Sequence, residues 1–193
     1  MCVADHQTAG RGRLGRIWEA PPGSALLCSV LLAPALPVDR FHLVTAAVAL
    51  AGLGAVEALT SVRAFIKWPN DLLVEPGAKL AGVLAEAEVP SVVVGIGMNL
   101  TAAPEGAAML GFGDRDAVLA SLLDHLSPLV ADWSTVPGLY RRACGTLGRV
   151  VRVELPDETF TGVAADVTDD GHLLVDVGMC LRTVAAADVV HLR

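Results

Sequence analysis

Residues 62–86 read V-R-A-F-I-K-W-P-N-D-L-L-V-E-P-G-A-K-L-A-G-V-L-A-E and show the clearest pattern of neighbouring strands in the chain. It contains three segments of strand length that are rich in apolar and β-branched residues, at 62–68, 71–75 and 79–86. Pro76-Gly77 separates the last two segments and is a strong turn signal, so they predict a β-hairpin. A hairpin closed at this turn would bring Lys79 close to Asp71.

Both lysines of the chain lie in this stretch. Of the 14 basic residues only Lys67 and Lys79 are lysines, in a chain whose composition otherwise favours arginine. A buried lysine amine beside the carboxylate of Asp71 would be costly, and such costly pairs concentrate at functional sites. A lone pair of this kind can also be an ordinary cross-strand ion pair on a surface hairpin, so its interpretation depends on the neighbouring motifs.

The flanking sequence predicts one sheet covered by helices. Further strand candidates lie at 3–4, 25–33 and 91–100. Helical candidates lie at 38–59, 114–133 and 136–144. We therefore expect an α+β fold with a mixed β-sheet packed against helices.

The texture of the chain changes after Gly145. Short alternating segments at 150–155, 160–167, 173–177, 182–184 and 189–192 are strand candidates. Asp169-Asp170-Gly171 is a tight hairpin turn. The pattern predicts a small β-barrel, with a domain boundary near Leu147 that divides the chain into domains at 1–146 and 147–193.

Residues 10–15 read G-R-G-R-L-G, which matches the G-x-G-x-x-G pattern of a dinucleotide-binding loop. That interpretation needs a helix that opens on the third glycine, so that its N-terminus meets the pyrophosphate. Here Pro21-Pro22-Gly23 follows within a few residues and cannot continue a helix. The acidic residue expected about twenty positions further on is also missing.

The same loop carries Arg11, Arg13 and Arg16 between its glycines. Arg-Gly segments that bind nucleic acid work through repetition and positive charge, whereas this chain has one short cluster and a formal net charge of -7. What remains is a mobile loop whose guanidinium groups can hold a phosphate or a carboxylate, or else a solvated surface loop. Trp18, which follows the loop, favours the first interpretation.

Other features exclude several classes of protein. The four cysteines form no C-x-x-C pair and fit no zinc spacing, so we expect buried reduced thiols and a cytoplasmic location. The first residues lack the pattern of a signal peptide, and the apolar runs are too short or too interrupted to cross a bilayer. We expect neither DNA nor a membrane as a partner.

Four segments in this order resemble the signature of biotin protein ligases, the biotin–[acetyl-CoA-carboxylase] ligases. They are Q-T-A-G-R-G-R-L-G-R from residue 7, K-W-P-N-D from residue 67, K-L-A-G from residue 79 and G-I-G-M-N from residue 95. The arginine-glycine loop and K-W-P-N-D together are highly specific. The resemblance extends from Val3 to the C-terminus, because that family ends in a small SH3-like β-barrel behind a class II synthetase-like core.

The resemblance implies a two-step reaction. The biotin carboxylate attacks the α-phosphate of ATP to give biotinyl-5′-AMP, and a lysine of a biotin carboxyl carrier protein domain then takes the biotin. The implied ligands are ATP, biotin and Mg²⁺, and the implied partner is the carrier domain of acetyl-CoA carboxylase or a related carboxylase. Which carboxylase it is, and whether the enzyme forms a homodimer, stay open.

The resemblance also assigns roles to residues at matching positions. Lys79, Arg13 and Asp71 are the implied catalytic residues. The implied contacts to biotin and its adenylate are Gln7, Gly10, Arg11, Gly12, Arg13, Lys79 and Gly82. The implied contacts to ATP are Trp18, Lys67, Asn70 and Asn99, and the division of labour among Lys67, Asn70 and Asp71 stays open.

In that family another stretch, with a Ser/Thr-Thr-Asn segment and a helix, precedes the part that begins here at Val3. Its contacts close one side of the biotin pocket, so we expect an incomplete pocket in this chain. Two alternatives therefore accompany the ligase hypothesis. One is a lipoate or octanoate ligase-transferase, which shares the fold, and the other is a shortened biotin-binding remnant without catalysis.

Overall fold

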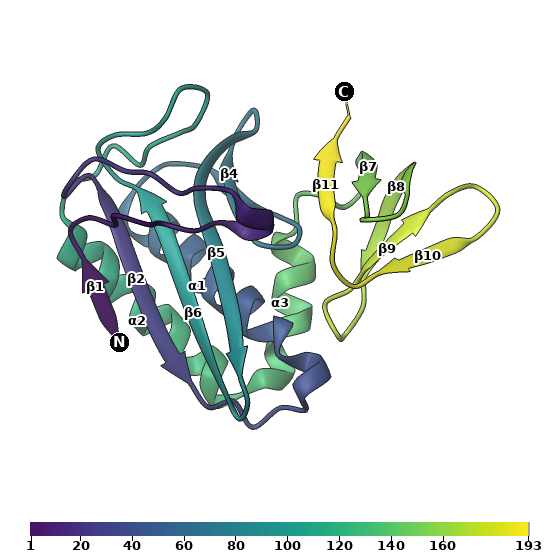
Figure 1. The fold of residues 1–193 in the computed structure, drawn as a ribbon, viewed down its shortest axis with the longest axis horizontal. Helices are drawn as coiled ribbons and strands as arrows, with labels where there is room; N and C mark the ends of the chain where they lie inside the picture. Colours follow the sequence, from purple (N-terminus) through teal and green to yellow (C-terminus); the bar gives the residue numbers. More distant parts are fainter. Residues whose placement is uncertain (193) are drawn as a thin grey trace.

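The computed structural model describes residues 1–192 and contains a six-stranded sheet and a five-stranded sheet (Figure 1). The six-stranded sheet has the order β1-β2-β6-β5-β4-β3, and its neighbouring strands are all antiparallel. Its strands are β1 (Cys2–Ala4), β2 (Ala25–Leu32), β3 (Ala64–Lys67), β4 (Asp71–Val74), β5 (Ala78–Glu88) and β6 (Ser91–Asn99).

The prediction of a mixed sheet was wrong. In the described residues the one parallel contact is an isolated bridge between Ile66 and Cys144. The strands β3 to β6 follow one another through turns of only a few residues, and such turns can join only antiparallel neighbours. The predicted hairpin at Pro76-Gly77 is confirmed, as the connection between β4 and β5.

Three α-helices cover one face of this sheet (Figure 1): α1 (His42–Leu59), α2 (Arg115–Ala131) and α3 (Val136–Ala143). The helix α1 contacts β3, β4, β5 and β6 on one side, and α2 and α3 on the other. The segment Val38–Leu59 has the length and the hydropathy of a membrane-crossing helix, but 61% of its apolar 18-residue stretch is buried inside the fold. Its apolar composition therefore serves the core.

The five-stranded sheet lies beside α3 and has the order β10-β9-β8-β7-β11 (Figure 1). Its strands are β7 (Val150–Glu154), β8 (Thr159–Val167), β9 (Leu173–Asp176), β10 (Leu181–Val184) and β11 (Asp188–His191). Alternate valines such as Val151 and Val153 are fully buried and form its interior. The α+β fold with a small C-terminal β-domain is thereby confirmed.

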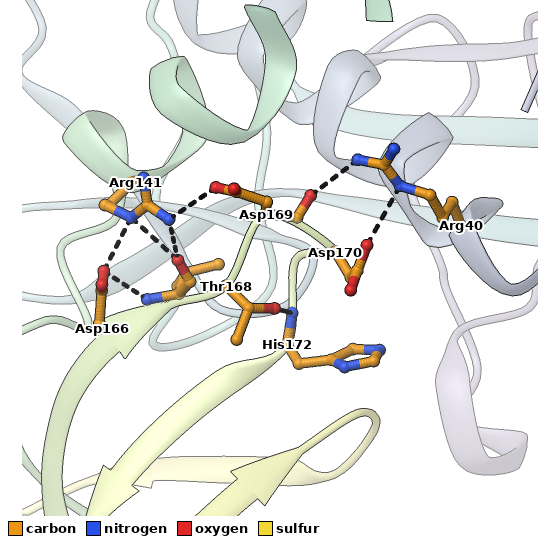
Figure 2. Close-up of polar contacts among 8 residues, drawn as sticks. Arg40, Arg141, Asp166, Thr168, Asp169, Asp170 and His172 are labelled. Atoms are coloured by element: carbon orange, nitrogen blue, oxygen red, sulfur yellow. Dashed lines mark hydrogen bonds and ion pairs between the residues drawn. The ribbon is translucent and has the colours of Figure 1, made fainter. Parts of the chain in front are cut away.

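Arginine side chains tie the two parts together (Figure 2). Arg141 of α3 donates to the backbone oxygen of Val167 at 2.9 Å and pairs with Asp166 at 2.8 Å and with Asp169 at 3.2 Å. Arg40, just before α1, pairs with Asp170 at 3.2 Å. The turn between β8 and β9 is thus held by the helical layer.

The expectation of buried thiols holds for half of the cysteines. Cys28 and Cys144 are buried, and burial raises the pKa of both thiols. Cys2 and Cys180 are exposed, because the first lies on the short edge strand β1 and the second lies in the turn before β10. All four thiols are free.

Candidate active site

The face of the sheet opposite the helices has a floor of glycine. Along β6 the residues Val94, Ile96 and Met98 are buried toward the helices, whereas Gly95 and Gly97 alternate with them and face the other way. Gly97 pairs with Gly82 of β5 across the sheet. The absence of side chains at these points lets a ligand or an aromatic ring approach the backbone closely.

A β-bulge in β5 sets which side chains share this face. The residue Leu72 pairs with Ala81 and the next residue, Leu73, pairs with Lys79, so that Leu80 is an extra residue in β5. In a regular strand Lys79 and Gly82 would point to opposite faces, because they are three positions apart. The bulge puts both on the glycine face, where Lys79 Nζ lies 3.1 Å from the position of a Cβ on Gly82.

Lys79 and Asp71 form the predicted pair. Lys79 Nζ lies 2.7 Å from Asp71 Oδ1. The pair is only partly buried, since the side chain of Lys79 is 40% exposed and that of Asp71 is 18% exposed. Because the glycines beneath it have no side chains, the Lys79 amine lies at the surface of a cavity and is accessible to a ligand. The Asp71 carboxylate holds the amine in position.

The segment between β1 and β2 crosses the glycine face (Figure 1). It is closed on itself like a hairpin: Trp18 N donates to Gly10 O at 3.0 Å, and Gly12 N donates to Arg16 O at 2.7 Å. A Cβ at Gly10 would lie 2.2 Å from the backbone oxygen of Trp18, so this position requires glycine. Leu14 adopts a φ of 54°, which is unfavourable for a residue with a branched side chain.

Trp18 lies on the glycine floor. A Cβ at Gly97 would meet its indole at 2.6 Å, and the Lys79 Nζ lies 5.8 Å from the ring centroid. The indole Nε1 is buried and has no hydrogen-bond partner among the described residues. The ring therefore covers the sheet next to the Lys79 amine.

The arginines of the loop reach three different parts of the molecule. Arg11 forms an exposed ion pair with Glu86 at 3.3 Å. Arg13 donates to Asn70 Oδ1 and to Ala187 O, both at 3.1 Å. Arg16 pairs with Asp188 of β11. The loop is thus bound to the K-W-P-N-D segment and to the C-terminal sheet at once.

Asn70 and Lys67 form the opposite wall. The Asn70 side chain donates from Nδ2 to Val83 O at 2.8 Å while its oxygen accepts from Arg13, so its orientation is fixed. Burial lowers the pKa of Lys67, and the neighbouring Asp71 opposes that change. A less hydrated ammonium group at this place is well suited to receive an anionic ligand.

Asn99 is a buried polar residue at the end of β6. Its Nδ2 donates to Ala108 O at 3.0 Å, and its Oδ1 is buried without a hydrogen-bond partner in the described part of the chain. Buried acceptors are almost always satisfied, so an unsatisfied one at a cavity indicates a place for a donor from a ligand.

These residues surround one cavity of about 640 Å³, a size typical of small-molecule sites. All the predicted site residues line it except Gly10, which is buried beneath Trp18. Sequence reasoning missed Leu27 and Ser29 of β2, and also Arg152 and Asp188 of the C-terminal sheet. No local signal identifies these four, because only the sheet pairing and the position of the C-terminal sheet bring them to the cavity.

Comparison with known families agrees with both parts of the fold. Residues 1–100 match the model of the biotin/lipoate A/B protein ligase family, and residues 146–192 match that of the biotin protein ligase C-terminal domain. The chain is 41% identical to the biotin–[acetyl-CoA-carboxylase] ligase of Mycobacterium tuberculosis, over 100% of this chain and 79% of that protein. It is 29% identical to the bifunctional ligase/repressor BirA of Bacillus subtilis, over 98% of this chain and 65% of that protein.

Among solved structures, the chain resembles biotin protein ligase from Aquifex aeolicus in complex with biotin and ATP. The TM-score is 0.85 and the sequence identity is 28%, over 98% of this chain and 88% of that one. The two halves of the fold, the order of the four motifs along the chain and these likenesses agree with one another. The chain therefore belongs to the biotin protein ligase family.

Proposed function

We propose that this protein catalyses the ATP-dependent attachment of biotin to a lysine of a biotin carboxyl carrier domain. The observation that carries the proposal is the position of the Lys79 amine. It stands 2.7 Å from Asp71, over the glycine floor of a cavity that the arginine loop crosses. The positive charge of Lys79 is thus held at the place where the biotin carboxylate and the α-phosphate of ATP would meet.

In the first step an oxygen of the biotin carboxylate attacks the α-phosphorus of ATP. The bond to the β-phosphate oxygen breaks, and pyrophosphate leaves with the electron pair. Negative charge gathers on the phosphate oxygens in the transition state, and fixed cations stabilise it without reorganisation. We assign this role to Lys79 and Arg13, with Asp71 holding the amine of Lys79 in place.

In the second step the carrier lysine attacks the carbonyl carbon of biotinyl-5′-AMP. An amide bond forms, the bond to the phosphate oxygen breaks, AMP leaves, and the attacking amine loses a proton. The nucleophile comes from the partner, so the enzyme has to hold and orient the anhydride and exclude water. We assign the enclosure to the loop of Arg11, Gly12 and Arg13.

The cavity offers two different ends for the two substrates. We propose that biotin lies over Gly82, near Gln7, against the Trp18 ring that covers Gly97. We propose that ATP lies toward Lys67, Asn70 and Asn99 and also contacts Trp18, because the Lys67 ammonium group and the unpaired Asn99 Oδ1 line the cavity.

The residues present suit Mg²⁺ that arrives with the nucleotide. Within residues 1–192 no group of three or more His, Cys, Asp or Glu side chains could hold a metal ion. Mg²⁺ usually keeps several waters and binds through phosphates with one or two carboxylates. We propose that it enters as MgATP, where it neutralises phosphate charge, and that Asp71 is its nearest carboxylate.

Two alternatives stay distinguishable. A lipoate or octanoate ligase-transferase would share the fold, but the C-terminal match and the named relatives support biotin. A remnant without catalysis would bind biotin and form no adenylate. The four free thiols and the need for ATP support a cytoplasmic location.

The test incubates the protein with ATP, Mg²⁺, biotin and a purified carrier domain. Mass spectrometry should show a gain of one biotinyl group on the carrier. Lipoate and octanoate in place of biotin serve as the matched comparison, and biotin-dependent ATP–pyrophosphate exchange isolates the first step. A carrier that stays unmodified with biotin, lipoate and octanoate alike, with no ATP–pyrophosphate exchange, would leave only the remnant hypothesis.

A further inference from the structure

The K-W-P-N-D segment is flanked by a short stretch that leads from α3 into the C-terminal sheet. Gly145 N donates to Ile66 O at 2.9 Å, and Cys144 forms a parallel bridge with Ile66, so this stretch lies along β3. A Cβ at Gly145 would lie 2.3 Å from the ring of Phe65, which leaves no room for a side chain. The next residue, Thr146, is thereby pressed against the end of β3.

Thr146 is completely buried, and its hydroxyl lies between two partners. Trp68 N donates to Thr146 Oγ1 at 3.0 Å, and His191 Nε2 lies 3.0 Å from the same oxygen. The partners come from distant parts of the chain: Trp68 belongs to the K-W-P-N-D segment, and His191 is the last residue of β11. A buried relay therefore joins the C-terminal sheet to the backbone of the active-site segment.

Proton counting fixes the form of this relay. The Thr146 hydroxyl accepts from Trp68 N and donates its single proton to His191 Nε2 when the neutral imidazole carries its own proton on Nδ1, which is the form we assign. Burial, together with the charges of Lys67 and Arg149, lowers the pKa of His191 to about 4. A charged imidazole would repel Lys67, which the proposed function places against ATP.

The rest of the segment is held from other sides. The Trp68 indole donates from Nε1 to Gly171 O at 2.9 Å, and Tyr140 donates its hydroxyl to Pro69 O at 2.9 Å. Trp68 itself is 2% exposed, so its ring offers almost no surface to a ligand. Its fixed place determines where the flanking Lys67 and Asn70 point.

We propose that Thr146 and His191 are positioning residues for adenylate formation: they fix the backbone of Trp68 and hence the ATP-facing side chains on either side of it. The inference rests on the proposed function and deepens it. It assigns to the C-terminal sheet a role in the first chemical step, through a hydroxyl and an imidazole that do not touch the substrates.

The main test compares Thr146→Val with Thr146→Ser. Valine keeps the shape and removes the hydroxyl, which leaves the buried Trp68 amide unsatisfied, whereas serine keeps the hydroxyl. In biotin-dependent ATP–pyrophosphate exchange we expect kcat/KM for ATP to fall about five- to a hundredfold with valine. We expect it to stay near the wild-type value with serine, and the Kd for biotin to change in neither variant.

His191→Leu and His191→Gln test the other end of the relay. Leucine removes the acceptor and should reproduce part of the loss, while glutamine offers an oxygen in its place and should restore activity. These variants also keep the proposal testable if Thr146→Val does not fold. Wild-type kinetics in the folded valine and leucine variants would overturn the proposal, even if their stability had fallen.

A readout without activity separates this inference from the proposed function. Hydrogen exchange of the Trp68 amide should be faster with valine than with serine, and ¹⁵N NMR should show His191 as the neutral tautomer with its proton on Nδ1. A wild-type protein that shows these signatures and yet catalyses no ATP–pyrophosphate exchange would refute the ligase proposal. The contact between Thr146 and His191 would then have a structural role alone. A His191 protonated on Nε2 at pH 7 would contradict the proton assignment.

Discussion

The cavity and the contacts of Arg141 in Figure 2 differ in how their polar atoms are paired. In the cavity Trp18 Nε1 and Asn99 Oδ1 are buried and have no hydrogen-bond partner within the described chain. In the cluster of Figure 2 the guanidinium of Arg141 meets a backbone oxygen and two carboxylates.

This difference distinguishes a ligand-binding site from a contact that only stabilises the fold. Buried polar atoms of a folded protein are nearly always paired, so unpaired ones at a cavity mark where a ligand supplies the partner. The Arg141 guanidinium has its partners within the chain and needs no ligand. Substitutions in the cavity should therefore lower catalytic activity and leave stability almost unchanged. Substitutions at Arg141 should lower stability and leave catalytic activity almost unchanged.

The largest effect is expected for Lys79→Ala. The amine is the one lysine held over the glycine floor, and its loss removes a fixed cation from the phosphate oxygens. Biotin-dependent ATP–pyrophosphate exchange should fall by about 10²–10³-fold, the usual cost of one such group. The thermal midpoint should change little, because the side chain is 40% exposed.

Lys79→Arg is the matched control. It keeps the charge but replaces a compact ammonium group by a planar fork, so an intermediate rate is expected. Near-normal exchange in the alanine variant would remove Lys79 from the chemistry and would make its contact with Asp71 an ordinary ion pair.

Gly97→Ala should have the next largest effect, on biotin binding. The new methyl group would lie 2.6 Å from the Trp18 indole and would displace the ring from the floor. Titration calorimetry should show a Kd for biotin about ten- to a hundredfold higher, as expected for overpacking. Gly95→Ala on the same strand has its nearest contact at 3.3 Å, with Ser29 Oγ, and should bind almost normally. Equal losses in both variants would argue against Trp18 as the cover of the biotin site.

Arg13→Gly should loosen the enclosure of the adenylate. The guanidinium joins the loop to Asn70 and to Ala187, so its loss frees the loop from both. Biotinyl-5′-AMP should leave about tenfold faster, which is the cost of one charged hydrogen bond. Mass spectrometry of a bystander protein should then find biotin on its lysines. Labelling of the carrier alone by the Arg13 variant would refute this role of Arg13.

The sequence alone predicts the hairpin and the meeting of Lys79 with Asp71, because a turn dipeptide and a strand pattern are local signals. It could not predict the bulge at Leu80, which puts Lys79 on the face of Gly82. A one-residue shift in strand pairing depends on how both strands pack. The sequence of apolar residues around Leu80 is the same with or without a bulge, so it gives no signal.

Contacts made across the whole chain were equally beyond sequence reasoning. Arg16 and Asp188 are separated by 172 positions, and nothing near either residue indicates the other. Thr146 and His191 read as ordinary residues of a turn and of a strand end. Their importance comes from burial beside Trp68, which is a property of the packed domains.

Arg141→Ala is expected to lower stability and to keep activity. It removes the hydrogen bonds to Val167 O and both ion pairs, and half-exposed charged contacts of this kind contribute about 1–2 kcal/mol. Urea unfolding measures the loss. Arg142→Ala, at the exposed neighbouring position of α3, should change stability by less than about 0.5 kcal/mol. The folded Arg141 variant should keep its ATP–pyrophosphate exchange activity. If its activity fell as much as that of Lys79→Ala, the distinction between the ligand-binding site and the stabilising contact would be wrong.

The smallest effect is expected from pH, through two imidazoles: His42, at the start of α1 beside His172, and His191, at the end of β11. Burial is the largest cause that lowers the pKa of both His42 and His191, and for His191 the value falls from 6.5 to about 4. The unfolded chain therefore binds more protons than the folded one once the pH falls below 6.5. These groups stabilise the fold fully above pH 6.5, and their contribution is lost as the pH falls toward their folded pKa values.

Urea unfolding between pH 7.5 and pH 5 should detect this loss, in a range where most carboxylates stay ionised. The midpoint should move to lower urea as the pH falls, and His191→Gln should reduce that movement, because glutamine takes up no proton. Since both rings are only half-buried, solvent screens part of the effect and keeps it below that of Arg141→Ala. An unchanged pH dependence in the glutamine variant would mean that His191 accepts its proton without cost, which the proximity of Lys67 argues against.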